Sequence, residues 1–143
     1  MLTPETLSKI TMKWNKKYAL GIAAIDAQHK QLFRLSDDLD AALSRGIRPQ
    51  DLDALLIRLK QYAARHFTLE ERHMAELNYA GLEEQQKTHE EFVNRYSKLH
   101  QQLTTDGLSA DLTNLLQQEL SGWIRDHVTG MDQQFGSFYK TRS

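Results

Sequence analysis

The chain has 143 residues, no cysteine and a net charge of −1, from 18 basic and 19 acidic residues. Its length suits a single domain with a core of its own, and the missing cysteine excludes disulfides, thiolate metal sites and cysteine nucleophiles. The balanced charge lacks the basic face that nucleic-acid binding needs, and no stretch is apolar for long enough to cross a membrane. We therefore expect a cytoplasmic protein without nucleic-acid or membrane partners.

Residues 1–20 carry no helical pattern and are expected to form an irregular N-terminal arm. Trp14, Tyr18 and Leu20 of this arm are available to pack on the rest of the protein. From residue 21 onward the composition changes, because Leu, Ala, Gln, Glu, Lys and Arg, all good helix formers, become frequent. The expected organisation is an arm followed by helices over 21–143.

Two long helices are expected in the first half of the chain. The first should run over about 22–44, since its leucines recur at spacings of three and four, and Gly46 is placed to end it. The second should begin at Pro49, a residue that suits the first turn of a helix, and should end near Tyr79, before Gly81. Both helices carry an apolar stripe along one side.

Two more amphipathic helices are expected in the second half. The third should run over about 82–103, and the fourth should begin after Ser109, whose hydroxyl suits a helix cap. A short C-terminal helix is expected through Phe135 and Phe138. Four amphipathic helices with short connections predict an all-α fold, an antiparallel up-down four-helix bundle.

The second helix places three metal-binding side chains on one stripe. With about 100° per residue, Glu70 lies about 40° from His66, and His73 about 20° from it on the other side. The stripe also includes Tyr62, Ala63 and Phe67, so it should face inward. A carboxylate buried between two imidazoles is costly unless a cation compensates it, and a pair of metal ions is the simplest compensation.

Further candidate ligands lie on the other helices. His29 lies in the first turns of the first helix, His89 lies in the middle of the third, and His127 and Asp132 come near the end of the fourth. His127 and Asp132 are offset by about 140° on a regular helix and could straddle a metal if the helix widens at Gly130. Imidazoles and carboxylates without thiolates suit iron, manganese or zinc. Two carboxylates among five histidines favour two ions bridged by the carboxylates.

Taken together, these residues resemble the hemerythrin family in its bacterial single-domain form, from Trp14 to Tyr139. The motifs that carry the resemblance are residues 25–30 (IDAQHK), 66–71 (HFTLEE), 89–92 (HEEF) and 123–127 (WIRDH) followed by Asp132. The resemblance implies one domain over 1–143 with a non-haem di-iron centre, an oxo or hydroxo bridge, and reversible binding of dioxygen for storage, delivery or sensing.

The resemblance also implies a role for most of the candidate ligands. Glu70 and Asp132 would bridge the irons, and His29 and His66 would hold the first iron, where an open position accepts dioxygen. The second iron would be held by His89 and His127. The oxygen pocket would be lined by Leu32, Phe67 and Trp123.

One position departs from the family pattern, which has a further histidine four residues before His89. Here that position is Gln85, whose amide oxygen is a weaker iron ligand than imidazole. Three interpretations stay open: Gln85 binds weakly or leaves a water-filled position, the centre is degraded, or another ligand replaces the missing one. His73, one turn beyond Glu70, is favoured as that replacement, whereas His100 lies about 16 Å along its helix from His89 and should not take part.

Two other functions compete with dioxygen binding. An altered second iron could make the protein a redox enzyme that acts on peroxide, nitric oxide or oxygen, since a labile position admits a substrate. A four-helix bundle can also serve histidine phosphotransfer, but that role needs an exposed histidine rather than inward-facing imidazoles. Because the bundle is self-contained, we expect a monomer.

Overall fold

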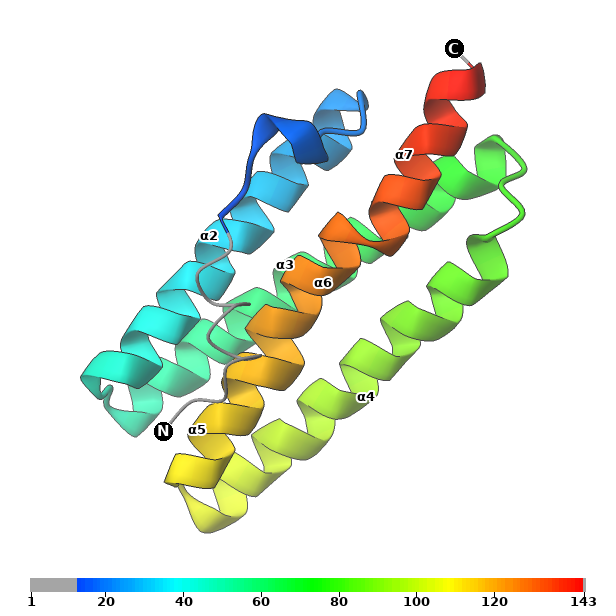
Figure 1. The fold of residues 1–143 in the computed structure, drawn as a ribbon. Coiled ribbons are helices and arrows are strands. Elements are labelled where there is room, and N and C mark those ends of the chain that lie inside the picture. Colours follow the sequence, from blue (N-terminus) through cyan, green and yellow to red (C-terminus); the bar gives the residue numbers. More distant parts are fainter. Residues whose placement is uncertain (1–12, 143) are drawn as a thin grey trace.

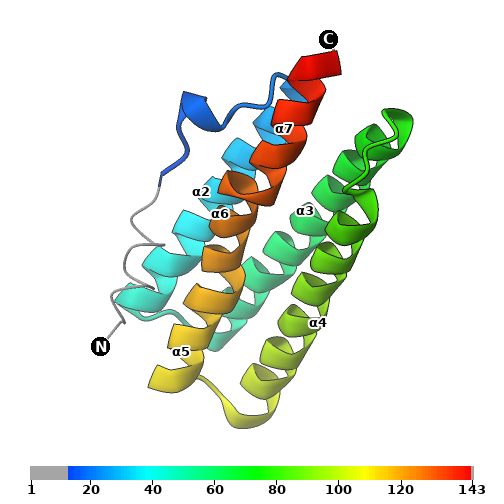
Figure 2. The ribbon, with the colours of Figure 1, turned by 45° about the vertical axis from the view of Figure 1, so that its right-hand side comes forward.

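The structure, a computed structural model, describes residues 13–142. Three long helices, α2 (Ala23–Arg45), α3 (Pro49–Glu76) and α4 (Leu82–Asp106), run alternately up and down, and a fourth, segmented rod completes the bundle (Figures 1 and 2). The prediction of an all-α antiparallel four-helix bundle is confirmed. None of the helices within residues 13–142 is both long enough and apolar enough to span a membrane.

The fourth rod is made of four segments rather than one helix. It begins with α5 (Ala110–Leu116), continues through the wider π-helical turn η2 (Gln117–Ser121) and α6 (Gly122–Thr129), and ends with α7 (Met131–Arg142). From the sequence, Gly130 was the residue at which the helix was expected to widen if His127 and Asp132 straddle a metal. The wide turn lies at η2 instead, and Gly130, with φ −112° and ψ −92°, interrupts the helix between α6 and α7.

The helices begin and end where local chemistry requires it. Pro49 occupies the first turn of α3, and the Ser109 hydroxyl accepts a hydrogen bond of 3.1 Å from the Leu112 amide at the start of α5. Gly46 and Gly107 end α2 and α4 with φ of +82° and +78°, in the left-handed region that glycine adopts most readily. These signals explain why the expected boundaries lie close to the observed ones.

The described part of the arm docks on the start of α2. It contains one short 3-10 turn, η1 (Lys16–Tyr18), and its buried residue Leu20 packs beside Phe135 of α7. The Asp26 carboxylate accepts hydrogen bonds from the backbone amides of Leu20, at 2.7 Å, and Gly21, at 3.2 Å. Asp26 thereby fixes the entry of the chain into α2. Residues 1–12 of the expected arm lie outside the described residues.

A buried ionic network attaches the fourth rod to α2. The Arg125 guanidinium is fully buried, and it donates to Asp40 at 2.6 Å and to Asp37 at 2.5 Å. The Ser121 hydroxyl, in the last position of η2, also donates to Asp40. Burial raises the pKa of the Asp40 carboxyl above its usual value, although Ser121 and Arg125 act to lower that pKa. The network fixes η2 and α6 against α2, directly before His127.

The apolar core is divided into two clusters. The larger one fills most of the bundle and includes Leu32, Phe67, Phe92 and Val128, and the smaller one lies near the arm and α7. The members of the smaller cluster are Leu20, Ile22, Ile25, Met74 and Phe135. Along α2, α3 and the fourth rod, the residues between the two clusters are His29, Glu70 and Asp132. A polar layer therefore lies across the core.

Candidate metal centre

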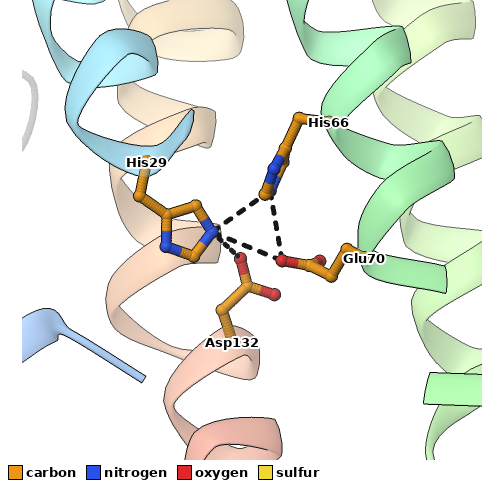
Figure 3. A group of neighbouring side chains, drawn as sticks. All are labelled: His29, His66, Glu70 and Asp132. Carbon is orange, nitrogen blue, oxygen red and sulfur yellow. Dashed lines mark hydrogen bonds and ion pairs between the residues drawn. The ribbon is translucent and has the colours of Figure 1, made fainter. Parts of the chain in front are cut away.

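Four buried side chains from three helices form one group within the polar layer. His29 comes from α2, His66 and Glu70 from α3, and Asp132 from α7, and their nitrogen and oxygen atoms all lie within 4.8 Å of one another (Figure 3). Each of the four is at most 1% exposed. His66 and Glu70 meet because they are four residues apart on one helix.

The distances within this group are those of side chains that surround a common point. His29 Nε2 lies 3.0 Å from Asp132 Oδ2 and 3.3 Å from Glu70 Oε2. His66 Nε2 lies 3.1 Å from the same Glu70 oxygen. The two imidazole nitrogens are themselves 3.1 Å apart.

A second group shares Glu70 and adds two imidazoles. His89 Nε2 lies 3.3 Å from Glu70 Oε1, and His127 Nε2 lies 3.9 Å from it. His127 Nε2 also lies 3.3 Å from Asp132 Oδ1. The nitrogens of His89 and His127 are 3.1 Å apart, like those of the first pair.

The two carboxylates each direct one oxygen to each pair of imidazoles. Glu70 Oε2 faces His29 and His66, whereas Glu70 Oε1 faces His89 and His127. Asp132 does the same, with Oδ2 near His29 and Oδ1 near His127. Each of the two groups could hold a metal ion, and the two carboxylates lie between them.

The atoms of the centre fit cations better than they fit one another. Glu70 Oε1 and Asp132 Oδ2 are buried and make no hydrogen bond within residues 13–142, although imidazole nitrogens lie near both. Two facing imidazole nitrogens 3.1 Å apart can share only one proton, so a single donor must serve both the facing nitrogen and the carboxylate oxygens beside it. Nitrogen and carboxylate donors without sulfur suit iron, manganese or zinc.

Comparison with known proteins identifies the family of this chain. A family model described as the hemerythrin HHE cation binding domain matches residues 20–139, which is most of the chain. The chain belongs to the hemerythrin family. The resemblance stated from the sequence motifs is thereby confirmed.

Named relatives in the hemerythrin family are similar along most of their length. The bacteriohemerythrin of Clostridium acetobutylicum is 24% identical over 85% of this chain and 96% of its own. The bacteriohemerythrin of Pseudomonas aeruginosa strain LESB58 is 27% identical over 83% of this chain and 75% of its own. The myohemerythrin of Riftia pachyptila is 26% identical, over 85% and 88% respectively.

Strong mutual electrostatics mark this hemerythrin centre. Burial alone would lower the pKa of the imidazoles, yet the Asp132 and Glu70 carboxylates raise it to about 9 for His29 and about 10 for His127. Burial alone would raise the pKa of Glu70, but the imidazoles around it, His66 foremost, hold that pKa well below its usual range. In the metal-free centre the imidazoles of His29 and His127 are therefore protonated near neutral pH, beside the ionised Glu70.

Two residues outside the ligand groups orient the imidazoles. Gln28 Oε1 lies 2.8 Å from His66 Nδ1, and Glu71 Oε2 lies 2.7 Å from His89 Nδ1. In each case the acceptor favours a proton on Nδ1 and leaves Nε2 free for a metal ion. Sequence reasoning assigned neither residue a role. The available signal was that Gln28 directly precedes the ligand His29, and Glu71 directly follows the ligand Glu70.

Aromatic rings cover the second imidazole pair. The Phe67 ring stacks on His89 with centroids 4.0 Å apart, and the Trp123 ring stacks on His127 at 4.7 Å. Leu32 is buried one turn beyond His29 in the larger apolar cluster. Phe67 and Trp123, expected beside the first ion position, thus lie chiefly against the second. Their role in an oxygen pocket stays a prediction.

The two candidates for the missing ligand differ in position. Gln85 is 1% exposed, and its Nε2 donates to Asp132 Oδ1 at 3.1 Å. His73 is only half-buried, belongs to neither ligand group, and its imidazole forms no hydrogen bond with another described residue. The geometry thus gives no support to ligation by His73. His100, as expected, lies apart from the centre and pairs with Asp53.

Proposed function

We propose that this protein binds dioxygen reversibly at a centre of two non-haem iron ions bridged by Glu70 and Asp132. His29 and His66 would hold the first ion, and His89 and His127 the second. The observation that carries the proposal is that each carboxylate directs one of its oxygens to each imidazole pair. When bound, the ions supply the electrons and the coordination position that dioxygen requires.

The residues around the centre meet the other requirements of dioxygen binding. Gln28 and Glu71 hold their imidazole partners in the form that binds metal, so the ligands need no rearrangement. The apolar clusters on both sides of the ligand layer, together with Phe67 and Trp123, exclude water from it. A dry, preorganised site protects bound oxygen from protons and hydrolysis.

Anaerobic loading with Fe²⁺ tests the proposal. The expected result is two tightly held ions per chain, an optical change on exposure to oxygen, and recovery of the first spectrum under vacuum. The His29→Leu variant should lose the first ion and the optical change, while the matched His100→Ala variant should keep both. Failure of the unaltered chain to take up iron, or an irreversible response to oxygen, would contradict reversible binding.

A second candidate function, redox catalysis on peroxide, nitric oxide or oxygen, is favoured by one observation. Gln85 stands where the family pattern has an imidazole, so the second ion would have a weaker ligand on one side. Single-turnover reactions of the reduced, iron-loaded protein with peroxide and with nitric oxide distinguish the two functions. Rapid turnover and oxidation, in place of a stable oxygen adduct, would favour the enzyme.

The burial of the ligand histidines argues against the third alternative, histidine phosphotransfer, which requires an exposed imidazole. Of the two histidines outside the ligand groups, both are only half-buried, and His100 is already engaged with Asp53 in an ion-pair contact of 2.5 Å. A monomeric state and a cytoplasmic location stay predictions, which size-exclusion chromatography and cell fractionation test directly.

A further inference from the structure

Gln85 is a buried amide with one half of its hydrogen-bonding capacity unused. It lies on α4 one turn before His89 and faces the interior of the bundle. Its Nε2 donates to Asp132 Oδ1, but its Oε1 is buried and receives no hydrogen bond from any residue in the range 13–142. Buried acceptors are rarely left in this state in folded proteins.

The hydrogen bond to Asp132 fixes which way the amide points. A carboxylate oxygen can only accept, so the nitrogen end of Gln85 must face Asp132, and Oε1 is left as the free end. Asp132 Oδ1 is the oxygen that approaches His127, 3.3 Å away, on the side of the second imidazole pair. Gln85 therefore lies on the side of the second ion position, one turn before His89 and beside the Asp132 oxygen that approaches His127.

The second position also has the looser set of ligand atoms. In the first group the imidazole nitrogens lie 3.0–3.3 Å from the carboxylate oxygens, whereas in the second group these distances are 3.3–3.9 Å. A carbonyl oxygen is a donor that iron, manganese and zinc all accept, and it is neutral like an imidazole. It would complete the second set without changing the total charge of the centre.

We propose that Gln85 Oε1 is a ligand of the second metal ion, and that this weak donor makes the two ion positions unequal. The inference rests on the proposed two-ion function and extends it. One ion is held firmly by His29, His66 and the carboxylates. The other ion is held less firmly, so the first position fills before the second and empties after it.

Calorimetric titration of the metal-free protein with Fe²⁺ under anaerobic conditions tests the inequality. We expect two ions per chain, with the second bound at least about tenfold more weakly than the first. The Gln85→His variant should strengthen the second ion and bring the two affinities together. Equal affinities in the unaltered chain, or a single bound ion, would overturn the proposal.

Two further variants separate a ligand from a residue that only donates to Asp132. Gln85→Leu removes both functions and should weaken the second ion. Gln85→Glu keeps an oxygen donor but loses the N–H group and faces Asp132 with a second carboxylate. If Gln85 is a ligand, the Gln85→Glu variant should bind the second ion more tightly than the unaltered chain does. If Gln85 only donates a hydrogen bond to Asp132, the variant should bind that ion more weakly. Gln86→Leu and Gln86→Glu, at the exposed neighbouring position, are the matched controls and should change neither affinity.

A direct measurement follows the amide itself. Zn²⁺ is diamagnetic and accepts the same donors, so side-chain amide signals of ¹⁵N-glutamine-labelled protein can be followed by NMR during loading. The Gln85 signal, assigned by its loss in Gln85→Leu, should shift only with the second equivalent of Zn²⁺, while the Gln86 signal stays in place. Uptake of two ions without a Gln85 shift would overturn the proposal and leave the two-ion centre intact, whereas absence of any uptake would refute the proposed function itself.

Discussion

The position of one proton decides whether an imidazole can bind a metal ion. His66 and His89 each have a hydrogen-bond acceptor at Nδ1, from Gln28 and Glu71, so the proton stays there and Nε2 points at the centre. The carboxylate of Glu71 is a stronger hydrogen-bond acceptor than the amide oxygen of Gln28. Gln28 and Glu71 thus prepare imidazoles that come from other helices.

We expect Glu71→Leu to weaken binding of the second ion by roughly 10- to 100-fold, the usual effect of losing such a partner. His89 would lose the acceptor that fixes its tautomer and ring orientation. Glu71→Gln keeps an oxygen acceptor and should recover most of the loss. Metal affinity measured by competition with a chelator provides the comparison, with exposed Glu90→Leu as the control; an equal effect of Glu90→Leu would contradict the assignment.

His73→Leu is expected to keep two bound ions. The imidazole of His73 is half-buried and belongs to neither ligand group, so its loss removes no donor. His89→Leu, in contrast, should release the second ion. Metal analysis after dialysis distinguishes these variants, and loss of one ion from His73→Leu would restore the hypothesis that a ligand has moved to α3.

Local spacing predicted one pair of candidate ligands, and the family resemblance of the motifs supplied the others. His66 and Glu70 lie four residues apart on one helix, and any amphipathic helix would bring them together. The state of Gln85 was not accessible in the same way. Its hydrogen bond to Asp132 joins residues 47 positions apart, and only the folded chain shows that Nε2 is engaged while Oε1 is free. The same holds for the rings of Phe67 and Trp123, whose partners are set by helix packing.

At the scale of the elements, irregular geometry in the fourth rod makes the centre possible. On a regular helix His127 and Asp132 would be offset by about 140°. The interruption at Gly130 separates α6 from α7 and allows both side chains to approach one ion position. The wider turn η2 adds a shift before His127, and wide turns of this kind are frequent at functional sites.

The turn at η2 could not be predicted from local sequence, because its stabilising contacts are distant in the chain. Ser121, at the end of η2, bonds Asp40 of α2, 81 residues earlier, and Arg125 bonds the same carboxylate. The four-helix plan itself was predictable, since the apolar periodicity and the punctuation at Gly46, Pro49 and Ser109 are local signals. The segmentation of the last helix was not.

Asp40→Ala is expected to lower the free energy of unfolding by about 1–3 kcal/mol, because it removes the more buried of the two carboxylates that pair with Arg125 and leaves one side of the guanidinium without an acceptor. Replacing both, as Asp40→Leu with Arg125→Leu, should cost much less, since no buried charge remains unpaired. Asp38→Ala, at an exposed position on the same helix, is the control. Urea denaturation measures all three, and a similar small loss in Asp40→Ala and Asp38→Ala would show that the ionic network is not stabilising.

At the scale of the whole molecule, the ionisable centre makes the stability of the metal-free protein dependent on pH. The pKa values of His29 and His127 are raised on folding to about 9 and about 10, from about 6.5 in the unfolded chain. Their contribution to stability is therefore fully present below about pH 6.5 and is lost as pH rises through 9 and 10. Glu70 acts in the opposite sense, since its lowered pKa adds stability that is lost in acid.

We accordingly expect the metal-free protein to be most stable near neutral pH and to lose stability steadily from about pH 7 to pH 10. Urea midpoints at several pH values measure this effect. The iron-loaded protein should lose much less over the same range, because its imidazoles bind metal in their neutral form and have no proton to lose. Equal pH profiles with and without iron would show that these histidines do not carry the dependence.

The layer of ligands across the core has a thermodynamic consequence. Because the two apolar clusters are separated by charged groups, hydrophobic contact alone does not couple one end of the bundle to the other. Ions bound to α2, α3, α4 and the fourth rod at once would supply that coupling. Melting of the iron-loaded chain should then be a single cooperative event, whereas the metal-free chain should melt over a broader range, with a van't Hoff enthalpy below the calorimetric one.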